Sequence, residues 1–109
     1  MHDAMGLLRH FQGLEVRLTD ERLEHILEHP EMRGSEAAIG VTLAHPERVV
    51  ESHFDSDIRL YYRFYRDTVV GAKHLCVVVK ISSEEGAFVL TAYLTDSIKR
   101  GRRLWPETE

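Results

Sequence analysis

The sequence predicts a small α+β domain in which two N-terminal helices pack on a roughly four-stranded antiparallel β-meander. The chain has 109 residues, enough for one compact domain, since an independent core usually needs about 100 to 200 residues. Its hydrophobic pattern changes from a period of 3.6 to a period of 2 after Pro46. The connections in the second half are short enough for hairpins, and hairpins join antiparallel strands.

The chain is expected to begin with a loose lead-in over residues 1–13 and a brief extended piece over residues 14–18. The first helix then follows Thr19, which can act as its N-cap. Its apolar face is predicted by the i, i+3, i+4 spacing of Leu23, Ile26 and Leu27. We expect this helix to end at about His29, because Pro30 disfavours helical geometry in the residue before it.

A second helix is predicted from the N-cap Ser35 to Leu43, where His45 and Pro46 end it. Four strands follow, over residues 48–52, 58–65, 73–81 and 87–95. On these strands we expect the core to receive Ile58, Leu60, Tyr62, Phe64, Leu75, Val77, Val79, Ile81, Phe88, Leu90, Ala92 and Leu94. A single domain over residues 14–105, with a tail at 106–109, is the organisation predicted.

The net charge of −4 argues against a nucleic-acid binder, because phosphate binding needs a positive surface. The charge is unevenly distributed, however. Residues 1–57 hold 12 acidic and 5 basic side chains, a balance of −7, and six of the seven histidines. Residues 58–109 hold 6 acidic and 9 basic side chains, a balance of +3. The sequence therefore predicts a locally positive face on an otherwise acidic molecule, with binding that weakens as salt rises.

Compartment is indicated by the single cysteine and by the absence of long apolar segments. Cys76 has no partner for an intramolecular disulfide, which favours a reducing cytoplasm, and its apolar neighbours predict a small packed hydrophobe. No stretch approaches the ~20 apolar residues of a membrane span, and the first residues do not resemble a signal peptide. We therefore expect a soluble cytoplasmic protein.

The first helix carries Arg22, His25 and His29 at i, i+3 and i+7, so they cluster on one side of the helix. One interpretation is that the imidazoles are tolerated at a helix rim, with His29 near the negative helix end. The other is that an imidazole transfers protons while Arg22 binds a phosphate. The segment also spells H-x-x-E-H, a zinc-peptidase pattern, but the short chain and the helix end at Pro30 argue against that function.

A second constellation is expected on the polar face of the sheet. It combines basic, aromatic and hydroxyl side chains, which suit single-stranded RNA because cations bind phosphates and aromatic rings stack on unpaired bases. The competing interpretation is an ordinary solvated sheet face. Its members are Arg59, Tyr61, Arg63, Tyr65, His74, Lys80, Thr91, Tyr93 and Thr95, and the basic cluster at 99–103 adds positive charge. Trp105 is expected to pack against the core edge.

Several segments resemble the phage-associated branch of the barnase/EndoU/colicin/RelE-like (BECR-fold) nuclease family. They are residues 22–31, 60–63, 76–80 and 91–99, within a resemblance that spans about residues 16–103. The resemblance implies a metal-independent RNA endonuclease with helices on one side of a small antiparallel sheet whose open face binds RNA. Members occur as toxins and as domains of phage proteins. The positions that match are His25 or His29, Arg63, Lys80, Thr91 and Tyr93.

The leading hypothesis is a small endoribonuclease, of the kind that an antitoxin or immunity protein neutralises, cleaving by attack of the ribose 2′-OH on the adjacent phosphate. It needs no metal and no cofactor, only proton transfer and cations at the phosphate. The predicted catalytic residues are His25 as acid or base, His29 as its support, Arg63 and Lys80 as phosphate clamps, and Thr91 and Tyr93 as donors. Predicted RNA contacts are Arg22, Arg59, Tyr61, Lys99 and Arg100.

The alternative is a non-catalytic RNA-binding or protein-interaction module with a nuclease-like fold. Both hypotheses use the polar sheet face, but the catalytic one also needs the rim of the first helix to reach it. A helix on the apolar face must then meet the polar face around the edge of the sheet. The position of that helix relative to the sheet is therefore the feature that matters most.

Overall fold

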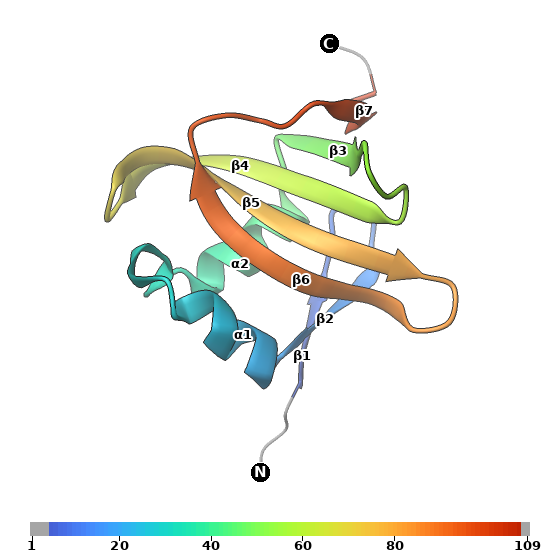
Figure 1. Ribbon diagram of the computed structural model, residues 1–109, viewed down its shortest axis with the longest axis horizontal. Coiled ribbons are helices and arrows are strands. Elements are labelled where there is room, and N and C mark those ends of the chain that lie inside the picture. Colours follow the sequence, from blue (N-terminus) through green and yellow to red (C-terminus); the bar gives the residue numbers. More distant parts are fainter. Residues whose placement is uncertain (1–4, 108–109) are drawn as a thin grey trace.

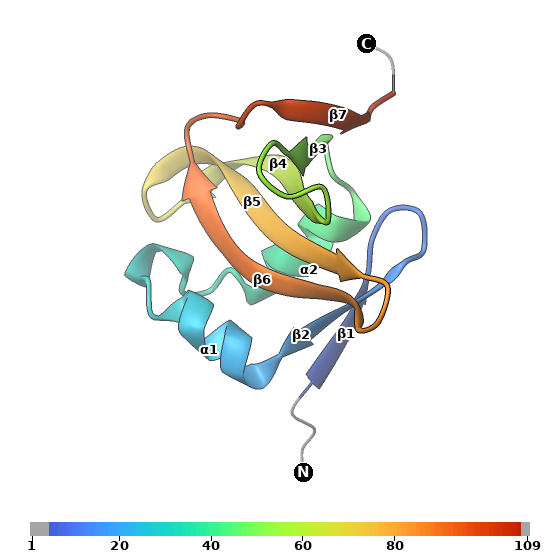
Figure 2. The same ribbon diagram turned by 45° about the vertical axis from the view of Figure 1, so that its right-hand side comes forward.

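The computed structural model describes residues 5–107 and shows one seven-stranded sheet with both α-helices on the same side of it (Figures 1 and 2). The elements, in chain order, are β1 (Met5–Arg9), β2 (Glu15–Thr19), α1 (Asp20–Leu27), a 3₁₀ turn (Pro30–Met32), α2 (Glu36–Ala44), β3 (Arg48–Ser52), β4 (Ile58–Thr68), β5 (Gly71–Ser82), β6 (Gly86–Thr95) and β7 (Gly101–Trp105). Within residues 5–107, no helix is long and apolar enough to cross a membrane.

The predicted fold class, two helices on a four-stranded antiparallel meander, is wrong. The sheet has seven strands in the order β1-β2-β6-β5-β4-β3-β7, and its β2–β6 pair is parallel (Figure 1). The four predicted strands are present as β3 to β6 and are consecutive antiparallel neighbours. Three further strands flank them, two from the N-terminal segment and one from the C-terminal basic cluster.

The extended piece expected over residues 14–18 is present as β2, whereas β1 and the pairing of both N-terminal strands were missed, because their partners lie outside the local sequence pattern. Part of the expected lead-in forms β1, which pairs with β2 and places Leu8 opposite Val16. In turn β2 pairs with β6, so that Val16 lies opposite Ala87. A parallel pair needs a long crossover, here the two helices and three strands, and no local periodicity signals such a distant partner.

The C-terminal strand was hidden by its basic composition. The predicted charge cluster continues as β7, which pairs antiparallel with β3 and lies at the edge of the sheet. Gly101 is required there, because a side chain would meet the backbone oxygen of Glu51. Trp105, expected to pack against the core edge, is 36% exposed and contacts Phe11, with the two ring centroids 5.0 Å apart.

The helices form where their sequence signals predict. The Thr19 side chain caps α1 by accepting a hydrogen bond from the backbone N–H of Arg22 at 3.1 Å. Ile26 of α1 and Ile39 and Leu43 of α2 are fully buried against the sheet. The helix-side core also contains Val16, Leu18, Met32, Val49, Tyr61, Leu75, Val77, Val79, Ala87, Val89 and Ala92.

The predicted orientation of β4 is wrong. Tyr61 lies opposite Val77 and belongs to the helix-side core, whereas Leu60 lies opposite Val78 on the other face. Tyr65 also faces the helices, because its hydroxyl donates a hydrogen bond to the Ala38 carbonyl of α2 at 3.2 Å. Large side chains pack on both faces of β4, so alternation along this strand could not identify the inner face.

The orientation of β6 is predicted correctly only in its second half. Ala92 faces the helices as expected, but Val89 is also buried there. A register shift lies between the pairs Val78–Thr91 and Val79–Val89, so the strand has one extra residue at Leu90. Phe88, expected in the core, consequently lies on the opposite face.

We call the face turned away from the helices the open face. A second apolar cluster lies on it, formed by Val50, Leu60, Tyr62, Cys76 and Val78. Cys76 is fully buried in this cluster, which confirms that it packs as a small hydrophobe. The open face therefore has an apolar floor beside the polar side chains that the sequence predicted there.

Candidate functional site

A groove of about 490 Å³ lies on the open face. Its floor is apolar, and residues from the segment after β3 and from the segment after β6 also line it. The lining residues are Ser52, His53, Phe54, Ile58, Leu60, Val78, Thr91, Tyr93, Lys99 and Arg100. Aromatic, cationic and hydroxyl groups therefore surround an apolar hollow, a combination that suits a ligand with flat rings and negative charge.

An exposed aromatic ring stands at this groove. Phe54 is 99% exposed, the highest value among the large hydrophobic residues described. Its segment turns sharply, because the Phe54 backbone N–H donates to the Ser52 hydroxyl at 3.1 Å. His53, next to it, is also exposed and lines the groove. A ring this accessible offers a stacking surface for a planar ligand.

Two cations come from the segment between β6 and β7. Lys99 and Arg100 are both exposed and both line the groove. The Lys99 ammonium lies 5.7 Å from the centroid of the Tyr93 ring, and the Lys99 backbone N–H donates to the Tyr62 hydroxyl at 3.0 Å. These contacts fix the segment over the sheet and hold positive charge beside an aromatic ring.

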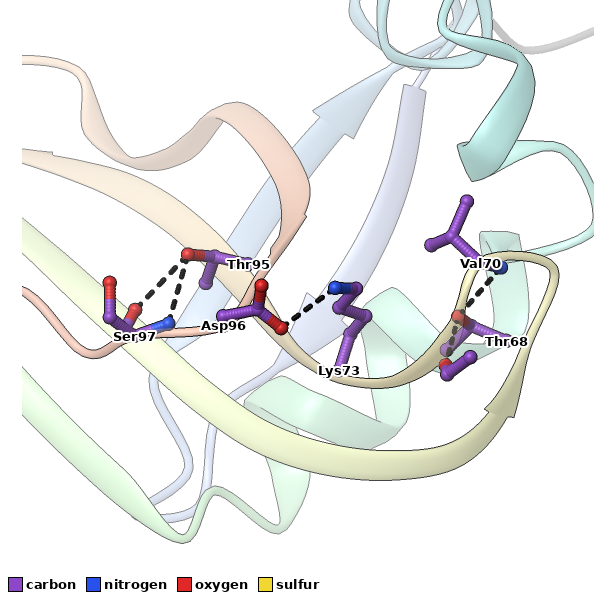
Figure 3. Close-up of polar contacts among 7 residues, drawn as sticks. Thr68, Val70, Lys73, Thr95, Asp96 and Ser97 are labelled. Carbon is purple, nitrogen blue, oxygen red and sulfur yellow. Dashed lines mark hydrogen bonds and ion pairs between the residues drawn. The ribbon is translucent and has the colours of Figure 1, made fainter.

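The start of the same segment is fixed by polar contacts that Figure 3 shows. The Lys73 ammonium lies 2.7 Å from the Asp96 carboxylate, and Asp96 is 79% exposed. The Ser97 backbone N–H donates to the Thr95 hydroxyl at 3.2 Å. The cationic segment is therefore attached to the sheet at its start and, through Lys99, near its end.

The chemistry of the floor excludes a thiol nucleophile. Burial raises the pKa of Cys76 to about 11 and raises the pKa of the neighbouring Tyr62 and Tyr93 hydroxyls as well. All three groups are therefore protonated and neutral at physiological pH. They can donate hydrogen bonds but cannot serve as bases.

The segment between β3 and β4 is attached to the sheet through Lys80. The Lys80 ammonium donates to the Asp55 carboxylate at 2.7 Å, and the same carboxylate accepts from the Asp57 backbone N–H at 2.9 Å. The hydrogen bond from Lys80 lowers the pKa of Asp55, and the same bond raises the pKa of Lys80. Both groups are therefore charged at physiological pH.

The groove collects four of the residues predicted as site residues: Thr91, Tyr93, Lys99 and Arg100. Lys80 belongs to the same face, opposite Ile58 of β4, which is also in the groove. The prediction that the last strand and the basic cluster contribute to one surface is thus supported by their placement.

The other predicted site residues do not line the groove. His25 and His29 are exposed on and just after α1, which packs on the helix side of the sheet (Figure 1). The His25 imidazole lies 3.5 Å from the Glu28 carboxylate. Arg22 is also on α1. The composite site that joins the helix histidines to the polar sheet face is therefore not assembled in this structure.

The three predicted residues of β4 lie on the helix side as well. Tyr61 is fully buried there, and Arg59 lies opposite Val79 of the helix-side core. The Arg63 guanidinium donates to the His45 carbonyl at 2.8 Å. The reversed orientation of β4 thus separates these residues from Thr91 and the other groove residues.

Sequence reasoning missed His53 and Phe54. The available signal was a large aromatic residue within a short polar connection, between Ser52 and Asp57. Such a ring has no place in the alternation of either adjacent strand, and connections often carry binding residues.

Within residues 5–107, no group of three or more His, Cys, Asp or Glu side chains is placed to hold a metal ion. Comparison of the chain with protein-family models, curated proteins and solved structures found no match. The resemblance to BECR-fold nucleases consequently has no support beyond the residues that suggested it.

Proposed function

We propose that the protein binds single-stranded RNA in the groove of the open face. The observation that carries this proposal is the exposed Phe54 ring beside two cations, Lys99 and Arg100, around one apolar hollow. Unpaired bases stack on aromatic rings, while lysine and arginine side chains bind the phosphates. A double helix keeps its bases stacked inside, so a hollow of this kind favours a single strand.

In the proposed complex, each part of the groove contacts a different part of the RNA. A base lies over the apolar floor against Phe54, and the backbone passes the cations. The Thr91 hydroxyl lies on the floor opposite Val78, where it can donate to or accept from a base or a ribose. The local positive charge supports this ligand although the whole chain carries −4.

The proposal is tested by titrating a fluorescent single-stranded RNA and measuring its anisotropy. We expect saturable binding, which Phe54→Ala weakens by about 5- to 150-fold, since stacking on one base is worth about 1–3 kcal/mol. Val69→Ala is the matched control, because Val69 is a 72% exposed apolar residue on the β4–β5 hairpin and does not line the groove. Absence of binding, or equal effects of the two substitutions, would contradict the proposal.

A second candidate function, RNA cleavage, is favoured by the presence of an exposed imidazole in the groove. His53 lines the groove together with Lys99 and Arg100. In this reaction the imidazole takes the proton of a ribose 2′-OH, and the 2′-oxygen bonds to the adjacent phosphorus. The bond from phosphorus to the 5′-oxygen breaks, and that oxygen takes a proton from water. The hydroxide that remains then takes the proton from the imidazolium, which restores the base. The cations stabilise the charge that develops on the phosphate.

Cleavage is tested with His53→Ala and, as the matched control, His25→Ala on α1. We expect His53→Ala to slow cleavage of single-stranded RNA by about 100-fold or more, with binding retained, and His25→Ala to leave it unchanged. Cleavage is also expected to persist in EDTA. If only His25→Ala lost cleavage, the catalytic imidazole would lie on α1 and not in the groove. If the wild-type protein bound RNA without cutting it, only the second function would be refuted.

A further inference from the structure

We infer that the Asp55–Lys80 ion pair is a latch that positions His53 and Phe54 at the groove. This inference rests on the proposed RNA-binding function and makes Lys80 a positioning residue rather than a phosphate ligand. The groove is lined on one side by Ser52, His53 and Phe54, the first part of the segment 52–57, so the attachment of this segment determines where the stacking ring lies.

The contacts of this segment converge on one end of β5. Besides the 2.7 Å ion pair from Lys80, the Ile81 backbone N–H donates to the Asp57 carbonyl at 2.8 Å. The Ile58 backbone N–H donates to the Asp55 carbonyl at 3.0 Å and closes the turn into β4. Phe54 immediately precedes Asp55 in the chain, so loss of the ion pair would release the backbone next to the ring.

The ion pair is partly shielded from water. The side chains of Lys80 and Asp55 are 31% and 36% exposed. In the pair of Figure 3, at the same 2.7 Å distance, Lys73 is 25% exposed and Asp96 is 79% exposed, so the two pairs differ in their carboxylates. Screening by solvent is weaker for the less exposed pair. The cationic segment 96–100 is also held by the Lys99–Tyr62 hydrogen bond, so its position depends less on its own ion pair.

Lys80 is a poor candidate for direct phosphate binding because a carboxylate already accepts from its ammonium. The pair is neutral as a whole, and an approaching phosphate would meet the Asp55 charge together with the Lys80 charge. A phosphate-binding role and a latch role therefore predict opposite effects when the aspartate charge is removed.

The decisive variant is Asp55→Asn, which can keep the turn hydrogen bond from Asp57 while it removes the ionic bond to Lys80. If Lys80 bound phosphate, this variant would free the ammonium, make the face more positive, and bind RNA more tightly. The latch predicts weaker binding, by up to about fivefold, the upper end of what a surface ion pair contributes. Asp67→Asn is the control: it removes one negative charge from an exposed position at the end of β4, away from both segments that line the groove, and we expect unchanged or tighter binding.

A second measurement follows the segment without RNA. Amide hydrogen exchange over residues 52–57 of the free protein is expected to accelerate in both Asp55→Asn and Lys80→Gln, and to remain as in wild type in Asp67→Asn. Because this measurement needs no ligand, it tests the latch even if the protein does not bind RNA. Failure to bind RNA would overturn the proposed function but not the latch. Tighter RNA binding by Asp55→Asn, or unchanged exchange in both variants, would overturn the latch.

Discussion

Removing the two cations of the groove has an effect that can be calculated from the number of phosphates they contact. Lys99 and Arg100 lie on adjacent positions and can each neutralise one phosphate of a bound strand. For single strands the logarithm of the binding constant falls with the logarithm of salt with a slope of about −0.7 per phosphate. The double variant Lys99→Gln/Arg100→Gln should therefore have a slope that is shallower by about 1.4.

The expected difference is large enough to measure by anisotropy. Between 50 and 200 mM salt, the fold-decrease in binding constant should be about seven times larger for the wild type than for the double variant. The control is Arg22→Gln/Arg33→Gln, which removes two exposed arginines outside the groove, on α1 and after the 3₁₀ turn. An unchanged slope in the groove variant, or an equal change in the control, would refute the assignment of the phosphates to the 96–100 segment.

Three further predictions concern the fold. Ile26→Ala deletes a fully buried side chain between α1 and the sheet and should lower the free energy of unfolding in urea by about 2–5 kcal/mol; a loss below about 1 would contradict its place in the core. Tyr65→Phe removes the hydroxyl that bonds Thr42 and Ala38 and should cost about 0.5–1.5 kcal/mol in the same assay. Burial lowers the pKa of His10, so the unfolded chain binds more protons below about pH 6.5; the free energy of unfolding should fall as pH drops below that value, and less so in His10→Phe.

The elements that local chemistry determines were predictable from the sequence. Thr19 caps α1 as its residue type suggested, and the apolar face of that helix is buried through Ile26. The extended core strands followed from the β-branched run in β5. In these segments the local preference and the tertiary packing agree.

The sheet order was not predictable, because it depends on partners far apart in the chain. The pairing of Val16 with Ala87 leaves no trace in the pattern of either strand. The basic cluster at 99–103 was expected only to add positive charge. Alternate residues of an edge strand can nevertheless point to water while the backbone pairs with β3, as in β7.

The candidate site was predictable where the strand orientation was right and failed where it was reversed. Thr91 and Tyr93 lie on the expected face and meet the cationic segment. Arg63 lies on the other face because β4 packs tyrosines against the helices. The alternation of β4 shows two faces but does not indicate which of them meets the helices. Phe54 was missed because an isolated aromatic residue in a connection has no periodicity to interpret.

Mapping backbone amide shifts during a titration with single-stranded RNA tests whether the open-face groove is the RNA-binding surface. The largest shifts are expected at Phe54, Thr91 and Tyr93 and at the cations Lys99 and Arg100, with little change along α1. Shifts concentrated on α1, or none at saturating RNA, would contradict binding in the groove.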